Sequence, residues 1–472
     1  MHNTSFGSGE ISKLNTQDEA KISEIVDALK VVAVVEKPQS ESESISFTSA
    51  IEESDMDLTE DSDISSEILK KGVKKANSLP QIPEKSLQPQ PLKSQSLRNN
   101  EARLRTYNNK LDGVEIVSPL NPFTLTISCL LYEPKEDDII ENEIRYIYLN
   151  SILSDNEQLY LAKLRRYAKN NGVKFPHLIW IQALRFLSST QFHVQTALDT
   201  MKNNHSFRLN ELPIHEKDVF DDLNMGAIYW HGRDSKYRPI LIVKLEKLDI
   251  FEGDIERIQK LLCFCLEFFL KYLQVAGRIE NWDVIIDLYG KGITDLPIQV
   301  LKSVLSLVNT RYKMRLYRMF IVNCPKLINV VSSALLAAIP GSTTRKVRFI
   351  DEPFSEEMTG LIPPEQLETT YGGTCPEINE NFYPFRFYPM NKEDEAFPNI
   401  HSIIPVEYIM GLSLEIPPKF DCEKLPWIKS LQNMNFTKGT AKKLSTIIGS
   451  KIRPVINLDD ILNTTSILEN KS

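Results

Sequence analysis

Few residues in this chain of 472 have the type and spacing that catalysis or metal binding needs. Lys291 follows Gly290, as the lysine of a phosphate-binding loop follows its glycine. However, Ile285 stands where that loop needs its first glycine, and Gly292 stands where a Ser or Thr would bind magnesium. The seven histidines are scattered without the spacing of metal ligands. We therefore predict a protein that is not an enzyme, with no catalytic residues, no metal and no cofactor.

Asp287 is the acidic residue whose position comes nearest to a catalytic one, because it ends a predicted buried strand. A nucleophile or general base can occupy such a place, so an unrecognised site around Asp287 stays open as an alternative. The structural alternative is that its carboxylate caps the following turn by binding local backbone N–H groups, and we favour this interpretation.

Composition and charge limit the class of protein. The formal net charge of −8 argues against a nucleic-acid-binding protein, although a local basic patch can still contact an anionic membrane. The six cysteines form no CxxC pair, which favours buried reduced thiols in a cytoplasmic protein. The polar N-terminus lacks the apolar core of a signal peptide, and no run of about 18 apolar residues appears. We predict a cytoplasmic protein that associates only peripherally with membranes.

The chain divides into four predicted parts. Residues 1–110 are acidic and rich in Ser and Pro, which predicts a disordered region that is either a plain solvated tail or a phosphorylated regulatory arm. Residues 111–215 predict a helical lobe, with helices over 144–171, 176–188 and 193–204. Residues 216–376 form the main domain. Residues 377–472 are an extension whose basic amphipathic stretch, 436–452, either packs on the protein or lies on a membrane.

In residues 216–376 short apolar runs alternate with helical segments, which is typical of an α/β sheet covered by helices. The predicted strands are Pro239–Leu245, Asp283–Leu288, Met319–Val322 and Val347–Ile350. The predicted helices are Glu256–Val275, Pro297–Tyr312 and Leu327–Ile339.

Four segments together indicate a family. They are Leu184–Leu187, Gly232–Asp234 with Arg238-Pro239, Ile285–Leu288 with Gly290, and Leu361–Leu367 with Tyr371–Thr374. In this order and spacing they resemble the CRAL-TRIO lipid-binding proteins. The resemblance implies an α/β fold whose mixed sheet forms an apolar lipid pocket covered by helices, with a small N-terminal helical lobe from about residue 150. It implies one bound phospholipid or other hydrophobic ligand, exchanged at membranes. A lipid-sensing scaffold that recruits partners through residues 1–110 is the alternative.

The segment 326–341 is apolar nearly all round, so it is either a buried core helix or a helix that meets something apolar intermittently. The resemblance implies a gate over the lipid. Transferring a two-chain lipid to water costs on the order of 20 kcal/mol, which explains why a closed apolar cavity is needed. The gate residues are Ile328, Val331, Leu335, Leu336 and Ile339. The expected cavity residues are Ile240, Ile242, Trp282, Val284, Ile286, Phe320 and Val322.

Headgroup contacts follow from the resemblance residue by residue. The Thr and Lys that bind inositol phosphate in the phosphatidylinositol-transfer branch match Thr343 and Lys346. The Arg and Glu of that set fall on Thr190 and Met314, so half of it is missing. The Ser and Thr that contact phosphocholine fall on Trp282 and Val284. The cargo is therefore not assumed to be phosphatidylinositol.

Overall fold

The computed structural model describes residues 120–292, 295–324, 345–350, 356–396 and 400. Their centre is a five-stranded mixed sheet, in which each strand lies beside the next one along the chain. Its strands are β3 (Ile228–Arg233), β4 (Pro239–Lys244), β5 (Trp282–Asp287), β6 (Leu316–Val322) and β7 (Val347–Phe349). The strand β3 is antiparallel to β4, and β4 to β7 are parallel. The predicted α/β class with a mixed sheet is confirmed, and all four predicted strands are present.

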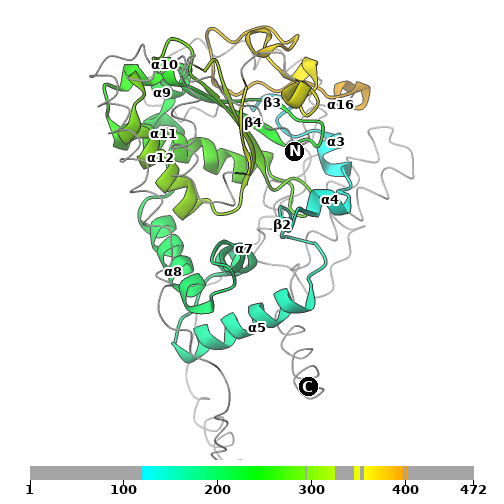
Figure 1. The fold of residues 1–472 in the computed structure, drawn as a ribbon, viewed down its shortest axis with the longest axis vertical. Coiled ribbons are helices and arrows are strands. Elements are labelled where there is room, and N and C mark those ends of the chain that lie inside the picture. Colours follow the sequence, from blue (N-terminus) through cyan, green and yellow to red (C-terminus); the bar gives the residue numbers. More distant parts are fainter. Residues whose placement is uncertain (1–119, 293–294, 325–344, 351–355, 397–399, 401–472) are drawn as a thin grey trace, which may run out of the picture. The chain divides into compact units, whose positions relative to one another are not determined.

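The helices that connect the parallel strands cover one face of the sheet (Figure 1). The connection from β4 to β5 runs through α10 (Leu245–Leu248), η5 (Asp249–Phe251), α11 (Ile255–Phe268) and the π turn η6 (Phe269–Leu273). The connection from β5 to β6 contains α12 (Ile298–Arg311). Connections between parallel strands are right-handed in nearly all proteins, and since the strands follow in order, both pass over the same face. The Phe269 ring packs there, 5.8 Å from Trp230 and 4.9 Å from Trp282. We call this face of the sheet the helix face.

Two short helices, η4 (Glu216–Asp218) and α9 (Phe220–Asn224), lead into β3, and later segments cover the opposite face of the sheet. Phe382 lies 5.0 Å from Tyr229, and the Tyr229 hydroxyl donates to Glu368 Oε1 at 3.0 Å. The elements here include α3 (Ile127–Leu131), α4 (Glu136–Ile139), α15 (Glu356–Thr359), η8 (Pro364–Gln366), η9 (Thr369–Tyr371) and α16 (Lys392–Ala396). We call this side the cap face.

A separate apolar core holds the N-terminal helical lobe together. Its helices are α5 (Asp155–Asn170), α6 (His177–Trp180), α7 (Ala183–Ser189) and α8 (Val194–Asn210). The helix predicted from residue 144 is wrong for its first eleven residues. Ser154 and Glu157 form a capping box that begins α5 at Asp155, and the preceding stretch contains a hairpin of β1 (Ile140–Glu141) and β2 (Ile144–Arg145).

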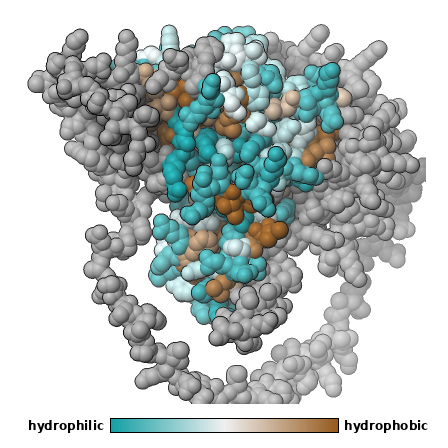
Figure 2. All heavy atoms as spheres, turned by 45° about the vertical axis from the view of Figure 1, so that its right-hand side comes forward, coloured by the Kyte–Doolittle hydropathy of each residue, from teal (hydrophilic) through white to brown (hydrophobic). Residues whose placement is uncertain are grey.

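Within the part of the chain that the structure describes, no helix is both long and apolar enough to cross a membrane. The surface in Figure 2 is mostly hydrophilic, and the apolar residues visible on it form separate small areas.

Candidate functional site

The sheet register divides the seven expected cavity residues between the two faces. Neighbouring residues of a strand point to opposite faces, whereas residues paired across strands point to the same face. Ile242 pairs with Ile285, which pairs with Phe320. Ile240, Ile242, Phe320 and Val322 therefore lie on the cap face, and Trp282, Val284 and Ile286 lie on the helix face. One cavity on one side of the sheet cannot contain all seven.

The two faces differ in how completely they are covered. On the cap face Ile240, Ile242 and Phe320 are at most 1% exposed. On the helix face an apolar surface is left half-buried, although it packs against the main core. This surface comprises Val243, Ile286, Met319 and Phe349 of the sheet with Leu301, Val304, Leu307 and Val308 of α12. Apolar side chains of this kind could contact an apolar ligand.

Asp287 has a structural role. Its Oδ1 accepts from the backbone N–H of Tyr289 at 2.9 Å, so the predicted cap of the following turn is confirmed. Asn323 Nδ2 donates to the same oxygen at 2.8 Å, and the Tyr371 hydroxyl donates to Oδ2 at 2.9 Å. Both oxygens thus hold the ends of β5 and β6 and attach residues 361–375, which we call the cap segment. The described part of the chain also contains no group of three His, Cys, Asp or Glu side chains placed to hold a metal.

Lys346 is an unusual lysine, because its side chain is buried at the start of β7. The residue is 4% exposed, and its Nζ donates to the carbonyl of Leu316 at 2.7 Å. Nζ also lies 4.8 Å from the centre of the Tyr146 ring. Burial, helped by the nearby Arg318 and Arg185 guanidinium groups, lowers the pKa of Lys346 to about 7.

Arg318 is a second cation near Lys346. Its guanidinium pairs with Glu141 of β1 at 3.2 Å, and its NH1 donates to the Tyr146 hydroxyl at 3.4 Å. It also lies over the Tyr317 ring, 4.3 Å from the ring centre. Lys346, Arg318, Glu141 and Tyr146 form what we call the basic cluster. Sequence reasoning identified Lys346 alone, because the other three carry no motif.

A pH-dependent stability is expected from Lys346. Its pKa of about 7 in the folded chain lies below the ordinary 10.5, so the unfolded chain binds more protons between these values. The contribution of Lys346 to the free energy of unfolding therefore rises with pH from about 7 upward. The stability advantage of Lys346→Met over wild type should shrink by about 2 kcal/mol between pH 7 and 9. Urea unfolding at several pH values measures this. The exposed Lys260→Met is the control, and a pH-independent difference for Lys346→Met would contradict the expectation.

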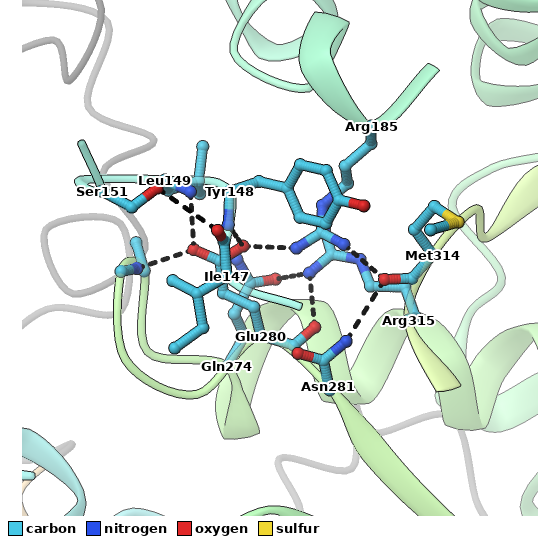
Figure 3. Close-up of polar contacts among 12 residues, drawn as sticks. Ile147, Tyr148, Leu149, Ser151, Arg185, Gln274, Glu280, Asn281, Met314 and Arg315 are labelled. Carbon is cyan, nitrogen blue, oxygen red and sulfur yellow. Dashed lines mark hydrogen bonds and ion pairs between the residues drawn. The ribbon is translucent and has the colours of Figure 1, made fainter. Parts of the chain in front are cut away.

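A buried ion pair joins the helical lobe to the sheet (Figure 3). Arg185 of α7 pairs with Glu280, and both side chains are almost fully buried. Glu280 Oε1 accepts from the N–H groups of Leu149 at 2.9 Å and Gly277 at 2.7 Å. Arg185 NH1 also donates to the carbonyl of Met314 at 2.7 Å. The Leu184–Leu187 segment therefore has a structural role, because it attaches the helical lobe to the segments before β5 and β6.

The positions that depart from the phosphatidylinositol pattern have structural roles here. The Thr190 hydroxyl donates to the carbonyl of Phe186 at 2.9 Å, which ends α7. Met314 has a positive φ of 55° and supplies its carbonyl to Arg185. Thr343 and the gate residues Ile328, Val331, Leu335, Leu336 and Ile339 lie outside the described residues, so their roles stay predictions.

Comparison with known proteins supports the resemblance. The CRAL/TRIO domain model matches residues 223–373. Protein real-time of Aedes aegypti is 23% identical over 290 residues, which are 55% of this chain and 44% of that protein. The phosphatidylinositol/phosphatidylcholine transfer protein SFH4 of Arabidopsis thaliana is 24% identical over 248 residues, 47% of this chain and 40% of that protein. The crystal structure of Sfh5 aligns with a TM-score of 0.39 and 12% identity over 52% of this chain and 96% of that one. The chain spans less than half the length of these two curated relatives.

Proposed function

Taking residues 223–373 as a CRAL/TRIO domain, we propose that this protein holds a single phospholipid or similar hydrophobic ligand and exchanges it at membrane surfaces. The domain match carries the proposal, and the name of the SFH4 relative indicates phosphatidylinositol and phosphatidylcholine as the lipids to test first. No catalytic step is part of this proposal.

We place the acyl chains against the helix face of the sheet. Val243, Ile286 and Met319 are apolar there and only half-buried, while the cap face is closed by aromatic and aliphatic side chains. Covering exposed apolar area stabilises a complex by about 25 cal/mol per Å², so these residues favour an apolar occupant. Of the residues expected from sequence, Val284 and Ile286 remain candidates for contacts with the ligand.

A gate between β6 and β7 completes the proposal. These two strands are parallel neighbours, and such connections are right-handed in nearly all proteins. A right-handed connection passes over the helix face, which is where we place the acyl chains. The apolar sequence Leu327–Ile339 belongs to this connection, so we propose that it covers the lipid and moves aside at a membrane.

We propose the basic cluster as the headgroup site, at the edge of the sheet where β6 and β7 begin. Arg318 and Lys346 alternate with the helix-face residues Met319 and Val347, so the headgroup lies at this edge and the acyl chains pass from it onto the helix face. Lys346 keeps the position that the resemblance assigns to it, and Arg318 supplies a second cation close by. An arginine guanidinium binds phosphate oxygens in pairs, and a buried lysine gains charge when an anion approaches. In this proposal Arg318 binds the phosphate in place of the Arg and Glu of the phosphatidylinositol set, whose positions are Thr190 and Met314 here.

The proposal is tested with gently purified full-length protein. Mass spectrometry should find co-purified lipid, and labelled phosphatidylcholine or phosphatidylinositol should move from donor to acceptor vesicles when protein is added. Filling the half-buried surface with Ile286→Trp should slow transfer at least tenfold, because the larger ring occupies the place of an acyl chain. The half-exposed Ile250→Trp is the control and should transfer normally. Absence of both lipid and transfer would refute the carrier function, and circular dichroism confirms that each variant folds.

A further inference from the structure

The hairpin of β1 and β2 places the carboxylate of Glu141 beside the two cations of the basic cluster. Glu141 ends β1, and the turn residues Asn142 and Glu143 both have positive φ, at 48° and 65°. Both Glu141 oxygens face Arg318 NH2, at 3.3 Å for Oε1 and 3.2 Å for Oε2. The two side chains are 29% and 18% exposed, so the pair is accessible from solvent without being fully hydrated.

The charges of the basic cluster do not balance. Arg318 is cationic, and Lys346, whose pKa is about 7, becomes fully cationic when an anion approaches; Glu141 raises the pKa of each of them. Among the described residues Glu141 is the one carboxylate that acts on both. Lys346 itself contacts a carbonyl and an aromatic ring, neither of which neutralises it. One carboxylate therefore serves two cations, which leaves room for a further negative charge.

We propose that Glu141 is a built-in counterion that competes with a phosphate anion for Arg318 and thereby limits the affinity of the basic cluster for anionic headgroups. This inference rests on the proposed headgroup site. A carboxylate and a phosphate offer an arginine the same pair of oxygens, so the two cannot both occupy the same side of the guanidinium. A ligand with a net negative charge must displace Glu141 or remain beside it. A zwitterionic headgroup brings its own cation and is affected less by that carboxylate.

The repulsion between Glu141 and a phosphate anion sets the expected change in affinity. Two unit charges about 7 Å apart in a partly hydrated site interact by an amount that corresponds to roughly a tenfold change in affinity. Glu141→Gln keeps the shape of the side chain and removes its charge. We expect this variant to bind anionic lipid about tenfold more tightly, and phosphatidylcholine within about twofold of wild type.

Glu143→Gln is the matched control, because it makes the same charge change two residues away at the exposed turn of the same hairpin. Wild type and both variants are titrated with phosphatidylcholine vesicles, with vesicles that also contain phosphatidylinositol, and with soluble inositol 1-phosphate. Tighter binding of phosphatidylinositol by Glu141→Gln alone supports the inference with a lipid headgroup as ligand. Tighter binding of soluble inositol 1-phosphate by that variant supports it with a free phosphate ester as ligand.

Equal gains in Glu141→Gln and Glu143→Gln would overturn the inference, because the effect would then be one of general surface charge. Unchanged selectivity in protein that binds lipid would also overturn it and would leave the carrier function standing. If no variant binds any lipid, the proposed function fails first. In an Arg318→Gln background Glu141→Gln should lose most of its effect, since the competition acts through Arg318.

Discussion

Glu280→Gln should lower the free energy of unfolding by about 3–5 kcal/mol, because it leaves the buried Arg185 guanidinium without its charge partner. The substitution also places an amide NH₂ group near the backbone N–H groups of Tyr148, Leu149 and Gly277, which at present all donate to the carboxylate. Donors that face donors are repelled, and in a buried site no water replaces the lost bonds.

The matched control is Asp199→Asn on α8, in the same helical lobe. Asp199 pairs with Lys202, but both side chains are about half exposed. Such surface pairs contribute about 0–1 kcal/mol, so this variant should unfold near the wild-type urea concentration. Equal effects of the two substitutions would show that the Arg185–Glu280 pair does not hold the lobe to the sheet.

The strands were predictable because their residues are apolar and bounded by turn formers. Each of β4 and β5 contains a short continuous apolar run, Ile240–Val243 and Val284–Ile286, which is typical of strands buried on both faces. Faces were harder to assign. Alternation places Trp282, Val284 and Ile286 together, but relating them to Ile240 requires the register between strands, which no local pattern contains. For that reason the expected cavity combined residues from opposite faces.

The basic cluster shows why the site was only half predicted. Lys346 was found through a family motif, and Thr343 lies outside the described residues. Arg318 and Glu141 are 177 residues apart in the chain, and neither belongs to a motif. Glu141 reaches Arg318 through a short hairpin, whose second strand lies where apolar periodicity favoured a helix from residue 144. Pair contacts at such separation depend on tertiary packing, which a single sequence does not reveal.

Three of the four segments that carried the resemblance are joined to one another by structural contacts. Asp287 of the third binds Tyr371 of the fourth, and Gly232 of the second lies against the backbone of Gln366. The N–H of Ser235 also donates to the carbonyl of Leu361 at 2.9 Å. These residues therefore attach the cap segment to the sheet, and the fold needs them whichever ligand is carried.

Gly232→Ala should be severely destabilising, by about 3–5 kcal/mol in the free energy of unfolding. Gly232 has a φ of 69°, and a Cβ added there would lie 1.9 Å from the carbonyl oxygen of Gln366. Main-chain atoms cannot rotate away as a side chain does, so either β3 or the cap segment must shift. Gly253→Ala is the matched control, because Gly253 has a φ of 79° and open space around the added Cβ.

The control should lose only about 1 kcal/mol, which is the penalty for a left-handed backbone alone. The difference between the two variants in urea unfolding then measures the close approach of β3 to Gln366. Limited proteolysis adds a local test, since a cap segment that has moved from the sheet should be cleaved within 361–375 before the sheet unfolds. Equal losses in the two glycine variants, with no new cleavage, would show that the cap segment adjusts freely and that this contact does not fasten it.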